Sequence, residues 1–180
     1  MKNRNIWYRR AALALMSGVI VLIFIFSSQP YRVQTIQPYL RQTLSLETAE
    51  RILPDLDIRY DGKQYRRDVN PFGFIEFLFR KGAHLFVYGV LAMLSAFTLN
   101  LYCKQRRISS SLSLLVVLII SLLDELNQSF SPARTPAYQD VLIDMAGGML
   151  GVAAFFAINR ICRSRSRSRS RRGMNRPSSV

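Results

Sequence analysis

The sequence has few of the residues that hold metal ions or form disulfide bridges in small proteins. Its 180 residues include one histidine, His84, and two cysteines, Cys103 and Cys162. A lone histidine with scattered carboxylates is a poor set of metal ligands, so we expect no metal site. We also expect no cofactor.

Charged residues are missing from long parts of the chain, although the whole carries a net charge of +14 from 25 Lys+Arg and 11 Asp+Glu. Apart from cysteine and tyrosine, four stretches contain only His84 and Asp144 as ionisable side chains. These stretches are residues 11–26, 83–103, 108–123 and 141–158. Such segregation excludes a single water-soluble core and a wholly disordered chain, and it predicts a small polytopic membrane protein.

The four apolar stretches are close to the length that membrane-spanning helices require, which is about 20 residues at ~1.5 Å each. The third stretch meets no Gly or Pro before Pro132, so its helix should continue through its acidic end. We therefore predict an all-α integral membrane protein with four transmembrane helices, at about residues 11–28, 83–103, 108–128 and 141–158. A short tail, 1–10, precedes this membrane domain, 11–158, and a basic Arg/Ser-rich tail, 159–180, follows it.

A cleavable signal peptide is an alternative interpretation of residues 1–28, because a charged start precedes the apolar run. The apolar region is long for a signal peptide, however, and Phe26-Ser27-Ser28 lacks an A-x-A-like cleavage pattern. We therefore expect a permanent first helix.

The numbers of Lys and Arg alternate along the connections. There are four in the N-terminal tail, three in the 104–107 connection and eight in the tail from Arg160, but one, Arg134, in the 124–140 connection. The positive-inside rule then makes both termini cytoplasmic. The loop 28–82, with nine bases and seven acids, faces outward. Both cysteines fall at cytoplasmic helix ends, where a disulfide is not expected.

The segments outside the membrane carry weaker patterns. In the outer loop, Asp61-Gly62 lies between two short alternating runs, which predicts a small hairpin over residues 57–66. Residues 38–53 have a helical apolar stripe and are a candidate surface helix. The Arg-Ser repeat from Arg163 is low in complexity and cannot form a hydrophobic core. We expect it to be attracted to anionic lipid headgroups and to have no specific nucleic acid as partner.

With this orientation, four pieces of sequence deliver polar groups to one outer layer of the membrane. These groups are Ser28 and Gln29; Arg80, Lys81 and His84; Asp124, Glu125 and Gln128; and Arg134, Asp140 and Asp144. Arg80 and His84 are four residues apart, as are Asp140 and Asp144, so each pair shares a helix face. Ionisable groups at membrane depth are costly unless paired or hydrated, which makes His84 and Asp144 candidate site residues. Helix anchoring by paired charges is the simpler alternative.

The same residues resemble the bacterial VanZ-like family of small membrane proteins. The matching pieces, in the family's order, are residues 26–30, 80–88, 124–128, Arg134, 140–142 and 147–151. The sequence departs from the family pattern at Asp144, where an Asn is common, and in its Arg-Ser tail.

This resemblance implies a four-helix protein of the bacterial cytoplasmic membrane and cell envelope. The founding member of the family is linked to low-level resistance to the glycopeptide antibiotic teicoplanin, without an established reaction. Many family members lie outside resistance clusters, so the resemblance alone does not assign antibiotic resistance to this chain.

Three functional hypotheses follow. In the first, the protein recognises an anionic membrane lipid or a lipid-linked envelope precursor through Arg80, Lys81 and Arg134, which Asp124, Glu125 and His84 orient. In the second, it is an enzyme with His84 as acid or base and Glu125 or Asp124 as its partner. The third is a structural subunit that packs on a protein partner through the small-residue pair Gly147 and Gly151.

Overall fold

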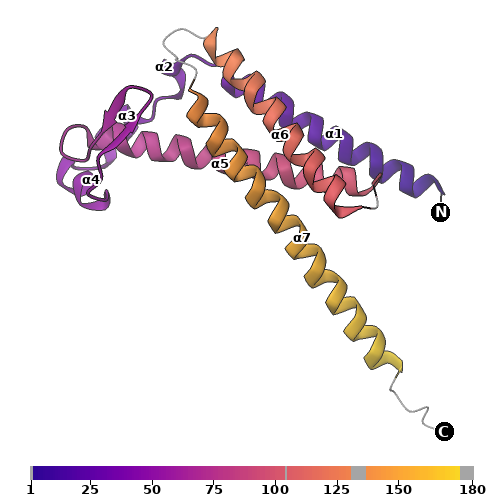
Figure 1. Ribbon diagram of the computed structural model, residues 1–180. Coiled ribbons are helices and arrows are strands. Elements are labelled where there is room, and N and C mark those ends of the chain that lie inside the picture. The colour runs from indigo at the N-terminus through magenta and orange to yellow at the C-terminus, as the bar shows by residue number, and fades with distance from the viewer. Residues whose placement is uncertain (1, 104, 131–136, 175–180) are drawn as a thin grey trace.

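The computed structural model describes residues 2–103, 105–130 and 137–174, with the backbone alone for helical residues 2–5, 163 and 165–174 (Figure 1). Arg134 and Lys104, both counted in the predicted topology, lie outside the described residues. Within this part of the chain, four helices are long and apolar enough to cross a membrane, which confirms the predicted all-α membrane fold. They are α1 (Lys2–Ser27), α5 (Pro71–Asn100), α6 (Arg106–Ser129) and α7 (Tyr138–Met174).

All four helices extend beyond the apolar runs, and α1 begins at Lys2 rather than at residue 11. Helix α5 begins at Pro71 rather than at residue 83, because the Asn70 side chain accepts a hydrogen bond from Gly73 N (3.0 Å) and proline suits the first turn. Helix α7 continues past residue 158, since no Gly or Pro interrupts it between Gly151 and Gly173. Hydropathy alone predicted the start of α5 too late and the end of α7 too early, because the additional helical turns contain charged residues.

The loop between α1 and α5 folds into short elements: α2 (Tyr31–Gln34), α3 (Gln37–Thr43), α4 (Leu46–Ile52), β1 (Ile58–Tyr60) and β2 (Lys63–Tyr65). The strands pair antiparallel, and Asp61 and Gly62 both have positive φ (49° and 69°), which confirms the predicted hairpin. The predicted helix over 38–53 is instead divided into α3 and α4. Ser45 starts α4 as its N-cap and accepts a hydrogen bond from Thr48 N.

The hairpin packs on the first turns of α5. Tyr65 stacks on Phe77 with ring centres 4.1 Å apart, and Tyr60 meets the same ring edge-on. We call this side of the bundle, where α1 and α6 end and α7 begins, the hairpin end (Figure 1).

Helix α7 packs most extensively on α5, and glycines permit the close approach. A Cβ atom built on Gly147 would lie 2.3 Å from Leu85 O, and one built on Gly151 would lie 2.0 Å from Gly89 O. Both glycines are buried in this contact. The assignment of this small-residue face to a protein partner is therefore corrected: α5 of the same chain already covers it, as two helix backbones in lipid approach through such a spacing.

Helix α6 presents a stripe of serines to the core. Ser109, Ser113 and Ser121 are each fully buried, four or eight residues apart. Ser109 Oγ donates to Ala96 O of α5 (3.2 Å), and Ser113 Oγ donates to Ser109 O (2.7 Å). Small hydroxyl side chains allow close helix packing in lipid and satisfy their own polar atoms.

Candidate functional site

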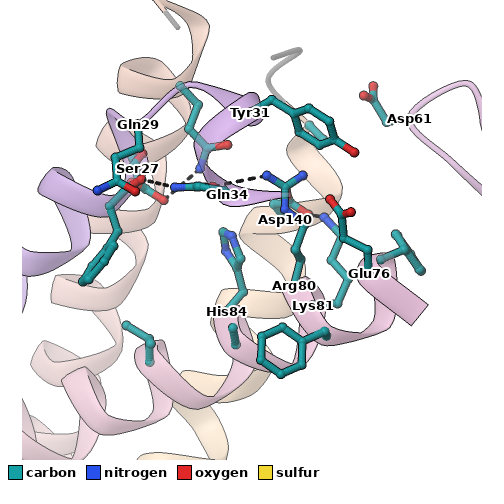
Figure 2. Close-up of a pocket in the computed structure, with 18 of the residues that line it drawn as sticks. Ser27, Gln29, Tyr31, Gln34, Asp61, Glu76, Arg80, Lys81, His84 and Asp140 are labelled. Carbon is teal, nitrogen blue, oxygen red and sulfur yellow. Dashed lines mark hydrogen bonds and ion pairs between the residues drawn. The ribbon is translucent and has the colours of Figure 1, made fainter. Parts of the chain in front are cut away.

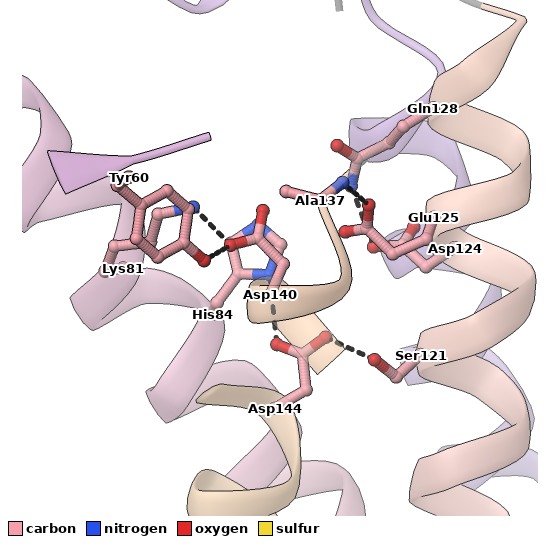
Figure 3. Close-up of polar contacts among 10 residues, drawn as sticks. All are labelled: Tyr60, Lys81, His84, Ser121, Asp124, Glu125, Gln128, Ala137, Asp140 and Asp144. Carbon is pink, nitrogen blue, oxygen red and sulfur yellow. Dashed lines mark hydrogen bonds and ion pairs between the residues drawn. The ribbon is translucent and has the colours of Figure 1, made fainter. Parts of the chain in front are cut away.

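Asp140, in the first turn of α7, joins this helix to α5 and to the hairpin (Figure 3). Its Oδ1 accepts hydrogen bonds from Lys81 Nζ and from the Tyr60 hydroxyl. The Lys81 ammonium also lies 4.2 Å from the centre of the Tyr60 ring. Burial and the bond to Asp140 raise the pKa of the Tyr60 phenol, so Tyr60 stays a neutral donor. The charge of Lys81 is therefore balanced within the chain.

His84 is oriented by a buried carboxylate one turn further along α7. His84 Nδ1 lies 3.0 Å from Asp144 Oδ1, and Ser121 Oγ of α6 donates to Asp144 Oδ2 at 2.6 Å (Figure 3). Asp144 is fully buried, whereas 24% of the His84 side chain remains exposed. Because Asp144 engages Nδ1, the ring nitrogen left to meet a ligand is Nε2.

Two adjacent carboxylates end α6 at the same level. Gln128 Nε2 donates to Asp124 Oδ2 (3.1 Å), and Ala137 N donates to Glu125 Oε2 (2.8 Å). Asp124 and Glu125 are 2% and 7% exposed. The Glu125 contact joins the last turns of α6 to Ala137, the residue that precedes α7.

Arg80 differs from Lys81 in its surroundings. Its Nη2 donates to Gln34 Oε1 (3.2 Å), and its guanidinium lies 4.8 Å from the centre of the Tyr31 ring (Figure 2). Among the described residues, Arg80 forms no ion pair with a carboxylate. Glu76, one turn earlier on α5, instead accepts a hydrogen bond from Thr35 Oγ1 at 2.8 Å. Of Arg80, Lys81 and His84, Arg80 is thus the one without a carboxylate partner among the described residues.

These side chains surround a cavity of about 1250 Å³ at the hairpin end, bounded by α1, α5, the tip of α6, the start of α7 and the hairpin (Figure 2). Such a volume exceeds the roughly 300–1,000 Å³ of typical small-molecule pockets. Of the site residues predicted from the sequence, those that line it are Gln29, Arg80, Lys81, His84, Asp124, Gln128 and Asp140.

The other predicted residues have different places. Asp144 lies behind His84, and Glu125 lies behind the start of α7, so neither lines the cavity. Ser28 donates to Phe24 O and accepts from Asn127 Nδ2, which ties α1 to α6 outside the cavity. Arg134 is outside the described residues.

The pairing of acids with bases differs from the sequence-based hypothesis. The recognition hypothesis gave Asp124, Glu125 and His84 the role of orienting the bases, and the enzyme hypothesis made Glu125 or Asp124 the partner of His84. In the structure Asp140 contacts Lys81 and Asp144 contacts His84. The physical reason is that α7 packs more extensively than α6 on α5, so the carboxylates of α7 reach its polar face.

Several residues of the site escaped the sequence analysis. Ser121 was hidden in an apolar run, although the four-residue spacing of the α6 serines indicated a buried face. Tyr31, Gln34 and Tyr60 come from the loop, and no local pattern connects them with α5. Glu76, only 3% exposed, was recognisable as a lone acid within an aromatic segment.

The fold and the site together define a multi-pass helical membrane protein with a cavity, lined in part by charged groups, at one end of its bundle. The VanZ/LLP1 family profile matches residues 12–159. The chain therefore belongs to the VanZ/LLP1 family. Neither the search of curated proteins nor the search of solved structures found a match to it.

Proposed function

We propose that this VanZ/LLP1 protein binds an anionic membrane lipid, or a lipid-linked precursor of the cell envelope, in the cavity at the hairpin end. The observation that carries the proposal is the setting of Arg80, which lines the cavity, donates to a neutral amide and has no carboxylate partner among the described residues. A phosphate group would supply the missing counter-charge through charge-assisted hydrogen bonds.

The neighbouring groups support this choice of ligand. Lys81 and His84 line the same cavity, and each is paired with a carboxylate of α7. Their positions are thus fixed before a ligand arrives, which lowers the entropy cost of binding. We place the hairpin end on the outer side of the cytoplasmic membrane, because the segments at the opposite end together carry 15 Lys+Arg, against ten in residues 28–82 and 124–140.

Binding to nanodiscs that contain phosphatidylglycerol or phosphatidylcholine tests the proposal, with retained lipids measured by native mass spectrometry. Arg80→Gln should weaken retention of phosphatidylglycerol by about tenfold, because a hydrogen bond to a charged group contributes ~1.5–3 kcal/mol. Arg59→Gln is the matched control: it removes the same charge from an exposed hairpin position outside the cavity. Equal retention of both lipids by the wild type would refute the proposal.

A role in teicoplanin resistance is a further part of this proposal, and it rests on the resemblance to the founding member. Expression of the wild-type chain in a susceptible bacterium should raise the teicoplanin concentration that inhibits growth. Expression of Arg80→Gln at the same membrane level should not. An equal effect of both chains would separate resistance from the cavity.

A membrane-embedded acid/base enzyme acting on the same lipid is the second candidate. The observation that favours it is the Ser121–Asp144–His84 chain of contacts, which fixes an imidazole at the wall of the cavity. Purified protein would be incubated with phosphatidylglycerol vesicles, and products would be followed by mass spectrometry. Turnover that His84→Gln abolishes would support an enzyme, whereas lipid binding without turnover would leave the recognition function.

A further inference from the structure

The cavity at the hairpin end is not wholly polar, because one sector extends down between two membrane-spanning helices. On α1 its wall is formed by Val19, Leu22 and Phe26, and on α5 by Ala83, Phe86 and Val90. Each set has the spacing i, i+3, i+7, so each forms one helix face. We call this sector the α1–α5 slot.

The depth of the slot matches one leaflet of a bilayer. From Phe26 to Val19 a helix descends about 10 Å, and from Lys81 to Val90 about 13 Å. Half of a ~30 Å hydrocarbon core is ~15 Å. Its walls also expose much apolar surface, since Leu22, Phe26 and Phe86 are 52%, 59% and 70% exposed.

Helix α1 is tied at both of its ends. Arg9 Nη2 donates to Leu101 O (2.9 Å), and at the hairpin end Asn127 Nδ2 donates to Ser28 Oγ (2.9 Å). Helix α1 also contacts α5 directly, so the two walls of the slot meet along part of their length. Apolar walls that continue from the charged groups of α5 suit the hydrocarbon chain of an amphiphile.

We propose that the α1–α5 slot holds a hydrocarbon tail of the lipid whose headgroup lies at Arg80, and that this lipid enters sideways from the bilayer. This inference rests on the proposed function and adds the place of the hydrocarbon tail and the route by which the lipid enters. Its basis is the continuity of one cavity from the charged groups of α5 to the apolar faces of α1 and α5.

The test uses phosphatidylglycerol with a photoreactive diazirine in the middle of an acyl chain, incorporated into nanodiscs with the full-length protein. After irradiation, mass spectrometry maps the labelled peptides. Labelling should be several-fold higher at residues 19–26 and 83–90 than on the exposed face of α7 at Leu142 and Met149. Equal labelling of all exposed apolar faces would overturn the proposal.

Two blocking variants and one control sharpen this test. Ala83→Trp fills the slot from α5, and Leu22→Trp fills it from α1; each should reduce slot labelling at least fivefold. Gly82→Trp is the matched control, because a Cβ atom there would meet no atom within 4 Å and Gly82 does not line the cavity. Each variant must elute as a single species with wild-type helix content. Unchanged slot labelling in both blocking variants would overturn the proposal.

The experiments distinguish failure of the headgroup proposal from failure of the tail proposal. If the slot is labelled equally by phosphatidylcholine and phosphatidylglycerol probes, the tail site stands and the anionic recognition falls. If phosphatidylglycerol is preferred but Ala83→Trp changes nothing, recognition stands and the tail site falls. Butyl phosphate, which has a phosphate headgroup and almost no tail, should not compete with the probe; effective competition would reassign the site to soluble phosphates.

Discussion

Gly151→Ala is the most direct test of how α5 and α7 hold the site together. The added Cβ would lie 2.0 Å from Gly89 O, a backbone atom that cannot rotate away. Real Cβ contacts essentially never fall below 3.0 Å, so the two helices must separate by about 1 Å. Overpacking of this kind typically costs ~1–3 kcal/mol.

The measurement is the free energy of unfolding in mixed micelles, followed by circular dichroism during a titration with denaturing detergent. Gly82→Ala is the control, because its new methyl group meets nothing within 4 Å. It gains only the higher helix propensity of alanine, ~0.5–1 kcal/mol. Gly151→Ala should therefore be the less stable of the two by at least ~1 kcal/mol. Equal stability would show that the close approach of α5 and α7 is not what stabilises the bundle.

Two further predictions concern the charge balance and the orientation. Lys81→Met and Asp140→Asn should each destabilise the protein by about 1–3 kcal/mol, because each leaves a charged partner that is only 10–19% exposed without its counter-charge. The double variant should lose less stability than the two single variants added together. Strict additivity in a double-mutant cycle would contradict the ion pair. With Cys103 and Cys162 replaced by serine, Gln64→Cys should react with an impermeant maleimide in intact cells, and reaction only after lysis would reverse the proposed topology.

The extent of each helix shows where local sequence was sufficient. Hydropathy located all four spans, because membrane insertion depends on the apolar content of a continuous segment. It missed the first turns of α5, where Glu76 and Arg80 interrupt the apolar run but an Asn70 cap and Pro71 start the helix. The hairpin was predictable because Asp61-Gly62 favours positive φ irrespective of what surrounds it.

The polar site shows where local sequence was not sufficient. Depth along each helix was enough to bring Arg80, Lys81, His84 and Asp140 to one level, and all four line one cavity. The contributions of Tyr31 and Gln34 were not predictable, since they depend on how the loop after α1 folds back over α5.

The sequence by itself determined the four spans, the hairpin turn and the layer in which the polar groups lie, because each depends on neighbours along the chain. Tertiary structure alone decided which carboxylate meets which base. That choice follows from the rotation and separation of whole helices, which are set by contacts such as that of Gly151 with Gly89. The same packing brings Asp144 rather than Glu125 to His84 and leaves the slot between α1 and α5 open.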